Sequence, residues 1–312
     1  MPMKISINLL PLASLAAGLF TLPTTGLQAA ILAYDGFDYE TGSIITPSST
    51  ANGNGGTGWT SRWNSAADNP ATVVTTDKNI SYTAEGVTYG GGNAMSVSGA
   101  NTVRAAERVF SPTVVTTGAD IYFSFVIQIT GGTAGEAVSG GFLSVSLFDT
   151  GFSAVQDNGI TFSGANAGAR VDNQTKNVTT ALTYGTTYLV VGRFSGWDAD
   201  SKTYQQTSVW LNPASDGFID TPVGSIVTTS SYASVSTDTG VGSNGYRGVI
   251  LRTNSLGSNV YIIDDIRIGT GWDDVVLTTV PEPATAAFLS ALGVFGVAMI
   301  TRRHFLSRNT AN

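Results

Sequence analysis

Apolar and polar residues alternate with a period of two in repeated short runs between residues 31 and 280. In the clearest run, 120–130, every second residue from Ile121 to Ile129 is Ile or Phe. A period of two places such residues on one face of a β-strand. The same rule holds in the runs 140–149, 187–194, 203–211 and 260–268. No stretch of this body has a convincing helical period, so the sequence predicts strands throughout.

Weaker alternation predicts further strands at 31–39, 94–98, 102–110, 159–162, 167–172 and 246–252. Strict alternation in 260–268 puts Ile262, Ile266 and Ile268 on one face of the strand. It puts Asp265 and Arg267 on the other face, and it separates the neighbours Asp264 and Asp265. One-sided strands without crossover helices favour an all-β fold with two antiparallel sheets packed face to face.

Composition narrows the chemistry of this body. The chain has 37 glycines, only 12% charged residues and no cysteine, so it contains no disulfide. Its single histidine, His304, lies beyond the last apolar run. The body therefore lacks the residue types of Ser-His-Asp, Cys-His and histidine-metal sites.

The net charge of the body bears on which macromolecules it can bind. Among the 15 Lys and Arg and the 22 Asp and Glu, four positive and one negative residue belong to the chain ends: Lys4, Arg302, Arg303, Arg308 and Glu282. The body keeps the other 11 positive and 21 negative residues, a net charge of −10. Such a surface disfavours nucleic acid and anionic lipid, and it suits a soluble exported domain.

The N-terminus has the pattern of a secretory signal peptide. Lys4 precedes an apolar run from Ile5 to Phe20, and residues 27–30 supply small residues for cleavage. The cleavage box is imperfect, because Leu27 or Gln28 stands where a small residue is usual. The alternative is an uncleaved membrane anchor.

The C-terminal segment is apolar from Ala284 to Ile300 and is followed by Arg302 and Arg303. As a helix it would span about 25 Å, close to the thickness of a bilayer core. Positive residues directly after such a span belong on the cytoplasmic side, which places the preceding body outside the cytoplasm. The alternative is a buried core helix at the end of a globular domain.

The order of triplet, apolar span and basic pair resembles the PEP-CTERM sorting signal of Gram-negative bacteria that make exopolysaccharide. The residues that carry this resemblance are Pro281, Glu282, Pro283, Arg302 and Arg303. The resemblance implies that a membrane-bound exosortase is the partner during export. It also implies that the tail holds the protein in the inner membrane transiently, and that the body then passes to the cell surface or extracellular matrix.

The body resembles PEP-CTERM proteins whose bodies are similar to concanavalin A-like lectin/glucanase domains. The resemblance rests on three stretches: 34–39 with Gly58, Trp59 and Trp63 after it, 209–213, and 264–275. It implies a jelly-roll sandwich. It fixes no function, because that fold carries lectins, glycosidases and adhesion modules.

Catalysis would have to use carboxylates. Glycosidases need two carboxyl groups about 5 to 9 Å apart. The Glu-x-Asp-x-x-Glu strand of glucanases with this fold is absent from the sequence. Asp35, Asp38 and Glu40 lie close together in sequence, as do Asp264 and Asp265, but hairpin ends and strand-edge ion pairs are the simpler interpretation. We predict no catalytic residues and no enzyme activity.

Exposed aromatic rings would let sugars stack on the body. Trp197 and Tyr204 flank a predicted hairpin tip, and Trp210 alternates with core residues, which predicts that it lies on the outer sheet surface. Trp side chains that cap the ends of the sandwich are the alternative. No cofactor is required, although Asp198 and Asp200 are weak candidate calcium ligands. They do not form a full binding loop, so a plain solvated turn is the favoured interpretation of these two residues.

Three parts are expected: a signal peptide at 1–30, the β-sandwich at 31–278, and a sorting tail at 279–312 with a membrane-spanning segment at 284–301. The expected function is non-catalytic contact with polysaccharide or other matrix components, or a structural role at the cell surface. The alternative is a glycoside hydrolase or lyase that acts through aspartates. A coat or adhesion protein without a small ligand is the third hypothesis.

Overall fold

The computed structural model describes twelve segments of the chain: 31–42, 55–64, 72–84, 86–99, 106–110, 119–148, 158–171, 174–178, 180–198, 203–212, 228–229 and 248–277. The predicted signal peptide and the whole sorting tail, including its membrane-spanning segment, lie outside these residues. Within the described part, no helix has the length and apolarity needed to cross a bilayer.

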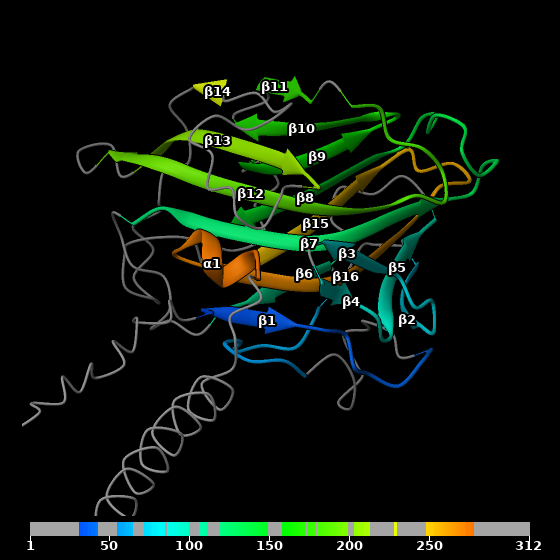
Figure 1. The fold of residues 1–312 in the computed structure, drawn as a ribbon, viewed down its shortest axis with the longest axis horizontal. Helices are drawn as coiled ribbons and strands as arrows, with labels where there is room; N and C mark the ends of the chain where they lie inside the picture. The colour runs from blue at the N-terminus through cyan, green and yellow to red at the C-terminus, as the bar shows by residue number, and fades with distance from the viewer. Residues whose placement is uncertain are drawn as a thin grey trace, which may run out of the picture.

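Two antiparallel sheets make up the body (Figure 1). The larger sheet has eight strands in the order β14-β13-β12-β7-β16-β5-β2, with β1 also paired to β16. Its strands are β1 (Ala33–Asp35), β2 (Thr72–Thr76), β5 (Ala94–Ser98), β7 (Ile121–Thr130), β12 (Thr187–Asp198), β13 (Thr203–Leu211), β14 (Thr228–Thr229) and β16 (Val260–Gly269).

The smaller sheet has six strands in the order β11-β10-β9-β8-β15-β6. They are β6 (Ala106–Val109), β8 (Phe142–Phe148), β9 (Asn158–Ser163), β10 (Asn166–Val171), β11 (Gln174–Asn177) and β15 (Gly248–Asn254). A separate hairpin consists of β3 (Ser81–Ala84) and β4 (Val87–Gly90). The described part of the chain thus confirms the all-β prediction and its main strands.

The main hydrophobic core lies between the two sheets. Alternate residues of β7, such as Phe123, Phe125 and Ile127, are buried there together with Leu143 and Val145 of β8. These residues come from the runs in which the period of two was clearest. The predicted face-to-face packing of two antiparallel sheets is therefore confirmed.

A second apolar layer covers the outer face of the larger sheet. It contains Val126, Trp210 and Ile262 from the sheet, with Tyr89 of β4 and Trp272 of the short helix α1 (Trp272–Val275). Figure 1 shows α1 lying against β7 and β16. The larger sheet is therefore buried on both faces, which alternation within its strands did not predict.

A bulge in β16 changes the direction of its side chains. The pairing of β16 with β7 shifts register between Asp264 and Arg267, and Asp265 has a φ of 56°. Ile262 packs in the outer layer, whereas Ile266 and Ile268 pack in the main core. The prediction that these three isoleucines share one face was wrong, because the bulge inserts an extra residue into the alternation.

The two ends of the described body lie together. Strand β1 pairs with the second half of β16, with Ala33 opposite Ile268 and Asp35 opposite Ile266. The Leu32 amide donates a hydrogen bond to the Ile268 carbonyl at 2.7 Å. The first and last strands of the described body are thus hydrogen-bonded neighbours in the larger sheet, and the site described next lies beside them.

Candidate functional site

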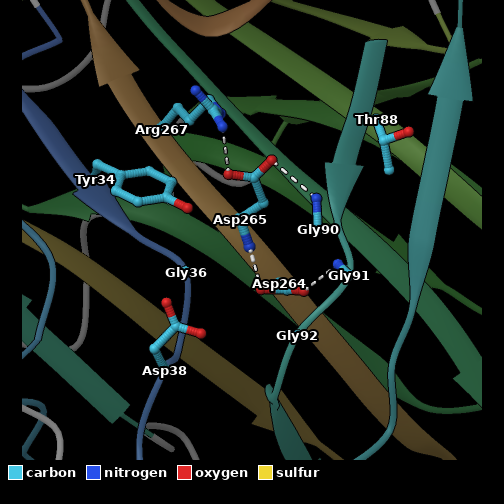
Figure 2. Close-up of a pocket in the computed structure, with 10 residues that line it drawn as sticks. All are labelled: Tyr34, Gly36, Asp38, Thr88, Gly90, Gly91, Gly92, Asp264, Asp265 and Arg267. Atoms are coloured by element: carbon cyan, nitrogen blue, oxygen red, sulfur yellow. Dashed lines mark hydrogen bonds and ion pairs between the residues drawn. The ribbon is translucent and has the colours of Figure 1, made fainter. Parts of the chain in front are cut away.

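A polar cavity of about 270 Å³ lies beside the bulge of β16, on the outer side of the larger sheet. Three segments that are far apart in the sequence line it (Figure 2). They are the β1 segment with Tyr34, Gly36 and Asp38, the end of β4 with Thr88, Gly90, Gly91 and Gly92, and β16 with Asp264, Asp265 and Arg267. The strand pairing of β1 with β16 brings the first and last of these segments together.

Both neighbouring aspartates of β16 face this cavity. Asp264 and Asp265 are 1% and 3% exposed, yet both carboxylates line the cavity wall. A regular strand would send them to opposite faces. The left-handed conformation of Asp265 in the bulge turns its side chain to the side of Asp264. The prediction that Asp264 and Asp265 lie on opposite faces of the strand was therefore wrong.

Backbone amides hold the two carboxylates in place. Asp264 accepts hydrogen bonds from the Asp265 amide at 2.7 Å and the Gly91 amide at 3.1 Å. Asp265 accepts one from the Gly90 amide at 3.0 Å and forms an ion pair with Arg267 at 2.9 Å. The Gly92 amide also acts on Asp264. A carboxylate has about four acceptor positions, so both carboxylates can still accept a donor from a ligand.

The glycine run 90–92 is required by this arrangement. Gly90 has a φ of 70°, and a Cβ atom there would lie 2.6 Å from the Ile80 carbonyl oxygen and 2.9 Å from Asp264 Oδ2. A Cβ on Gly92 would lie 3.2 Å from Asp38 Oδ1. Only glycine lets the backbone approach the carboxylates this closely. No strand was predicted before these glycines, and the three consecutive glycines 90–92 are the signal in the sequence that could have marked this wall.

Tyr34 closes the side opposite the glycines. The Arg267 guanidinium lies over its ring, 4.9 Å from the centroid, and Figure 2 shows the Tyr34 hydroxyl directed toward Asp265. At Gly36, an added Cβ would lie 2.5 Å from this hydroxyl oxygen. The cavity therefore combines an aromatic ring, a guanidinium and carboxylates, a mixture suited to a small polar ligand with many hydroxyl groups.

Burial changes the ionisation of the cavity. Desolvation raises the pKa of Asp264 to about 7, although the Asp265 and Gly91 amides act in the opposite direction. Desolvation also raises the pKa of the Tyr34 hydroxyl, with a further contribution from the charge of Asp265. Near neutral pH, Asp264 therefore exchanges a proton while the phenol keeps its own.

The other face of the β1 segment is structural. Asp35 is fully buried and forms an ion pair with Arg108, and it accepts hydrogen bonds from the Phe37 amide at 2.9 Å and Trp63 Nε1 at 2.6 Å. The Arg108 guanidinium also lies 4.7 Å from the centre of the Trp59 ring. Alternation therefore divides the opening motif 34–39: Asp35 and Phe37 anchor it, and Tyr34, Gly36 and Asp38 face the cavity.

The predicted sugar-stacking aromatics lie elsewhere and are mostly covered. Trp210 does point away from the main core, but it is 2% exposed because the Trp272 ring packs edge-on against it at 5.3 Å. Tyr204 is 1% exposed, and its hydroxyl donates to the Ala119 carbonyl at 2.6 Å. Neither ring can stack on a sugar from solvent, so both predictions are corrected. Trp197 is half-buried beside Tyr204 and stays a prediction.

Other predicted site residues lie outside the part of the chain that the structure describes. Asp200 and the side chain of Asp198 are not among the described groups, so the calcium prediction is untested. The sorting residues Pro281, Glu282, Pro283, Arg302 and Arg303 also lie outside it. Within the described segments, no group of three or more His, Cys, Asp or Glu side chains is arranged to hold a metal ion.

Comparison with known proteins finds only distant structural similarities. No protein-family model matches the sequence, and no curated protein matches it. Among solved structures, the chain is similar to the CBM22-1 xylan-binding domain from Paenibacillus barcinonensis Xyn10C, with 14% identity and a TM-score of 0.31 over 77% of this chain and 94% of that one. It is similar to basic winged bean lectin with Tn-antigen, with 13% identity and a TM-score of 0.32 over 66% of this chain and 88% of that one.

A third similar structure is the binding domain of botulinum neurotoxin serotype C1, with 10% identity and a TM-score of 0.34 over 84% of this chain. The chain spans only 52% of the length of that structure. At these identities and TM-scores the similarities carry no argument about function. The function proposed below is therefore based on the residues that line the cavity.

Proposed function

We propose that this chain is an exported protein of the cell surface or extracellular matrix with a jelly-roll body, and that it binds carbohydrate without catalysis. The observation that carries the binding proposal is the polar cavity between β1, β4 and β16. The apolar segments at both ends and the resemblance of the tail to a PEP-CTERM signal support export and processing by an exosortase. The acidic body without cysteine or histidine is compatible with such a destination.

The cavity offers the groups that sugars use. Carboxylates accept hydrogen bonds from sugar hydroxyls, and Asp264 and Asp265 each keep lone pairs for this purpose. Thr88 and Tyr34 add hydroxyl groups, and Asp38 stands exposed at the mouth. A volume of about 270 Å³ is at the small end for ligand pockets, so the site fits one sugar unit of a polymer better than a longer segment.

Polysaccharide retention tests this proposal. The full chain, purified in detergent to accommodate its apolar tail, is passed over immobilised polysaccharides that include the producer's own extracellular polymer. We expect retention of the native protein and loss of retention for Asp264→Asn. Asp273→Asn is the matched control, because Asp273 is an exposed aspartate of α1 that does not line the cavity. Retention that survives Asp264→Asn, or no retention on any polymer, contradicts the proposal.

A glycoside hydrolase or lyase is the second candidate function. It is favoured by one observation: Asp264 and Asp265 share the cavity but have different partners, since only Asp265 pairs with Arg267. Two carboxyl groups in different surroundings can divide the roles of acid and base. If this candidate holds, the native protein releases reducing ends or unsaturated products from a polysaccharide panel, and Asp264→Asn abolishes the release. Binding without product formation favours the non-catalytic function.

A further inference from the structure

The cavity is acidic in its charge balance as well as polar. Three carboxyl groups line it, from Asp38, Asp264 and Asp265, against the single guanidinium of Arg267. That guanidinium is already engaged by the Asp265 carboxylate at 2.9 Å and by the ring of Tyr34. A ligand that enters this space therefore meets an excess of negative charge.

We propose that the cavity selects a sugar unit with a free, protonated amino group, which is a non-acetylated hexosamine within a polysaccharide. This inference rests on the proposed carbohydrate-binding function and specifies its substrate class. An ammonium group supplies three hydrogen-bond donors and one positive charge, and both complement carboxylate oxygens that keep spare lone pairs.

The position of the carboxylates fits such a ligand. Asp38 is exposed at the mouth, while Asp264 is buried at the base with one oxygen against the Gly91 amide. Figure 2 shows Asp38 and Asp264 on opposite sides of the glycine-lined space. Both carboxylates border the glycine run: a Cβ on Gly92 would lie 3.2 Å from Asp38 Oδ1, and the Gly91 amide donates to Asp264. We expect the ammonium group to lie between them and the ring hydroxyls of the sugar to face Thr88 and Tyr34.

Acidic and neutral sugars fit less well. A uronate or sulfated sugar would bring a second anion next to three carboxyl groups, and like charges in a partly desolvated site repel strongly. Arg267 does not offset this repulsion, because its charge is already neutralised by Asp265. A neutral or N-acetylated sugar keeps the hydroxyl contacts but brings no positive charge to the carboxyl groups of Asp38 and Asp264. The expected order of affinity is therefore amino sugar, then neutral sugar, then acidic sugar.

A divalent cation is a weaker explanation of the same acidity. Calcium takes six to eight converging oxygen ligands. Here the oxygens of Asp264 and Asp265 are separated among different backbone amides and Arg267, and in the described segments no metal-holding group of acidic side chains is found. Donors that approach singly, such as N–H and O–H groups, suit these oxygens better.

Calorimetric titration of the full chain in detergent tests the selection. The probes are soluble oligomers of glucosamine, N-acetylglucosamine, glucose and galacturonate. We expect the glucosamine oligomer to bind about tenfold more tightly than the N-acetylated one, and Asp264→Asn and Asp38→Asn each to reduce that ratio several-fold. The control Asp273→Asn should keep the ratio. Asp38 is exposed, so its variant keeps the test valid if Asp264→Asn does not fold.

A lysine oligomer of equal charge controls for attraction between a cation and the acidic body. If it binds as well as the glucosamine oligomer, or if the preference survives both cavity variants, the inference is overturned. If neutral and amino sugars bind equally and Asp264→Asn removes both, the proposed function stands and the selection fails. If no oligomer binds although an immobilised polysaccharide retains the protein, the selection fails and the proposed function stands; if nothing binds in either experiment, both fail.

Discussion

Removal of the Arg108 side chain should strongly destabilise the β1 segment, which lines one side of the cavity. Arg108 is 1% exposed and is the ion-pair partner of the fully buried Asp35. Its Nε also donates to the Ser61 carbonyl at 3.0 Å, and its Nη2 donates to the Gly55 carbonyl at 2.7 Å. Arg108→Met keeps most of the aliphatic stem but leaves the Asp35 carboxylate buried without its counter-charge.

The expected loss is about 3–5 kcal/mol in the free energy of unfolding, the range for breaking a buried ion pair by removing one partner. A loss of this size is a large part of the stability of a typical domain, about 5–15 kcal/mol. Hydrogen bonds from Trp63 and Phe37 to Asp35 remain and soften the effect, whereas the loss of the contacts to Ser61 and Gly55 increases it.

Denaturant unfolding followed by tryptophan fluorescence measures this loss, because Trp63 and Trp59 both contact the ion pair. A double-mutant cycle with Asp35→Asn isolates the pair itself, and we expect a coupling of about 2 kcal/mol or more. A loss below about 1 kcal/mol for Arg108→Met, or no coupling in the cycle, would refute the reasoning that the pair anchors the β1 segment.

Four further predictions concern the cavity, the outer layer and the tail. The free energy of unfolding should fall as pH rises from about 4 to 7, because Asp264, with a pKa of about 7, binds its proton more tightly in the folded chain than in the unfolded chain. Denaturant titrations at several pH values should show a slope of up to about 1.4 kcal/mol per pH unit, and the Asp264→Asn variant should lack this slope. Gly90→Ala should lower the free energy of unfolding by about 1–3 kcal/mol more than Gly135→Ala does. Both glycines have a positive φ, but only at Gly90 would the added Cβ lie 2.6 Å from a backbone oxygen. Thermal melting of the two variants measures the difference. Trp210→Ala should lower stability by about 3–5 kcal/mol through a cavity under Trp272 and leave the affinity of the remaining folded protein for sugar unchanged in calorimetry. Glu282→Gln in the triplet should leave the tail uncut and the protein in the membrane fraction, which immunoblotting of fractionated cells detects.

Each of these expectations has a contrary result. A pH slope that persists in Asp264→Asn would assign the proton to another group. Equal melting temperatures for the two alanine variants would mean that the wall of the cavity yields easily. Loss of sugar binding in a folded Trp210→Ala protein would restore Trp210 as a ligand contact. Normal release of the Glu282→Gln protein would exclude the exosortase interpretation of the tail.

Local alternation was sufficient to predict most of the sandwich. In β7 the period of two identified Phe123, Phe125 and Ile127 as core residues, because this strand pairs with β12 without a bulge and its alternation is unbroken. It was insufficient in β16, where a single residue breaks the period. Asp265 adopts a left-handed conformation without being glycine, and nothing in the local sequence marks it as a bulge.

The candidate site depends on contacts that no local pattern contains. Trp210 was correctly predicted to leave the main core, but the helix residue that covers it, Trp272, lies far along the chain. Likewise, Tyr34, Gly91 and Asp264 meet only because β1 pairs with β16 and the end of β4 lies beside the bulge. Residues so far apart in the sequence cannot be assigned to one site until the order of strands in the sheet is known.

Strand β16 also defines a mechanical path through the molecule. It carries Asp264 and Asp265 in its middle and leads through α1 to Leu277, which precedes the tail. A pull between a ligand in the cavity and the C-terminus would run along this short stretch and bypass the smaller sheet. Because this second half of β16 has β7 on one side and β1 on the other, such a load would shear two rows of backbone hydrogen bonds at once instead of breaking them one by one.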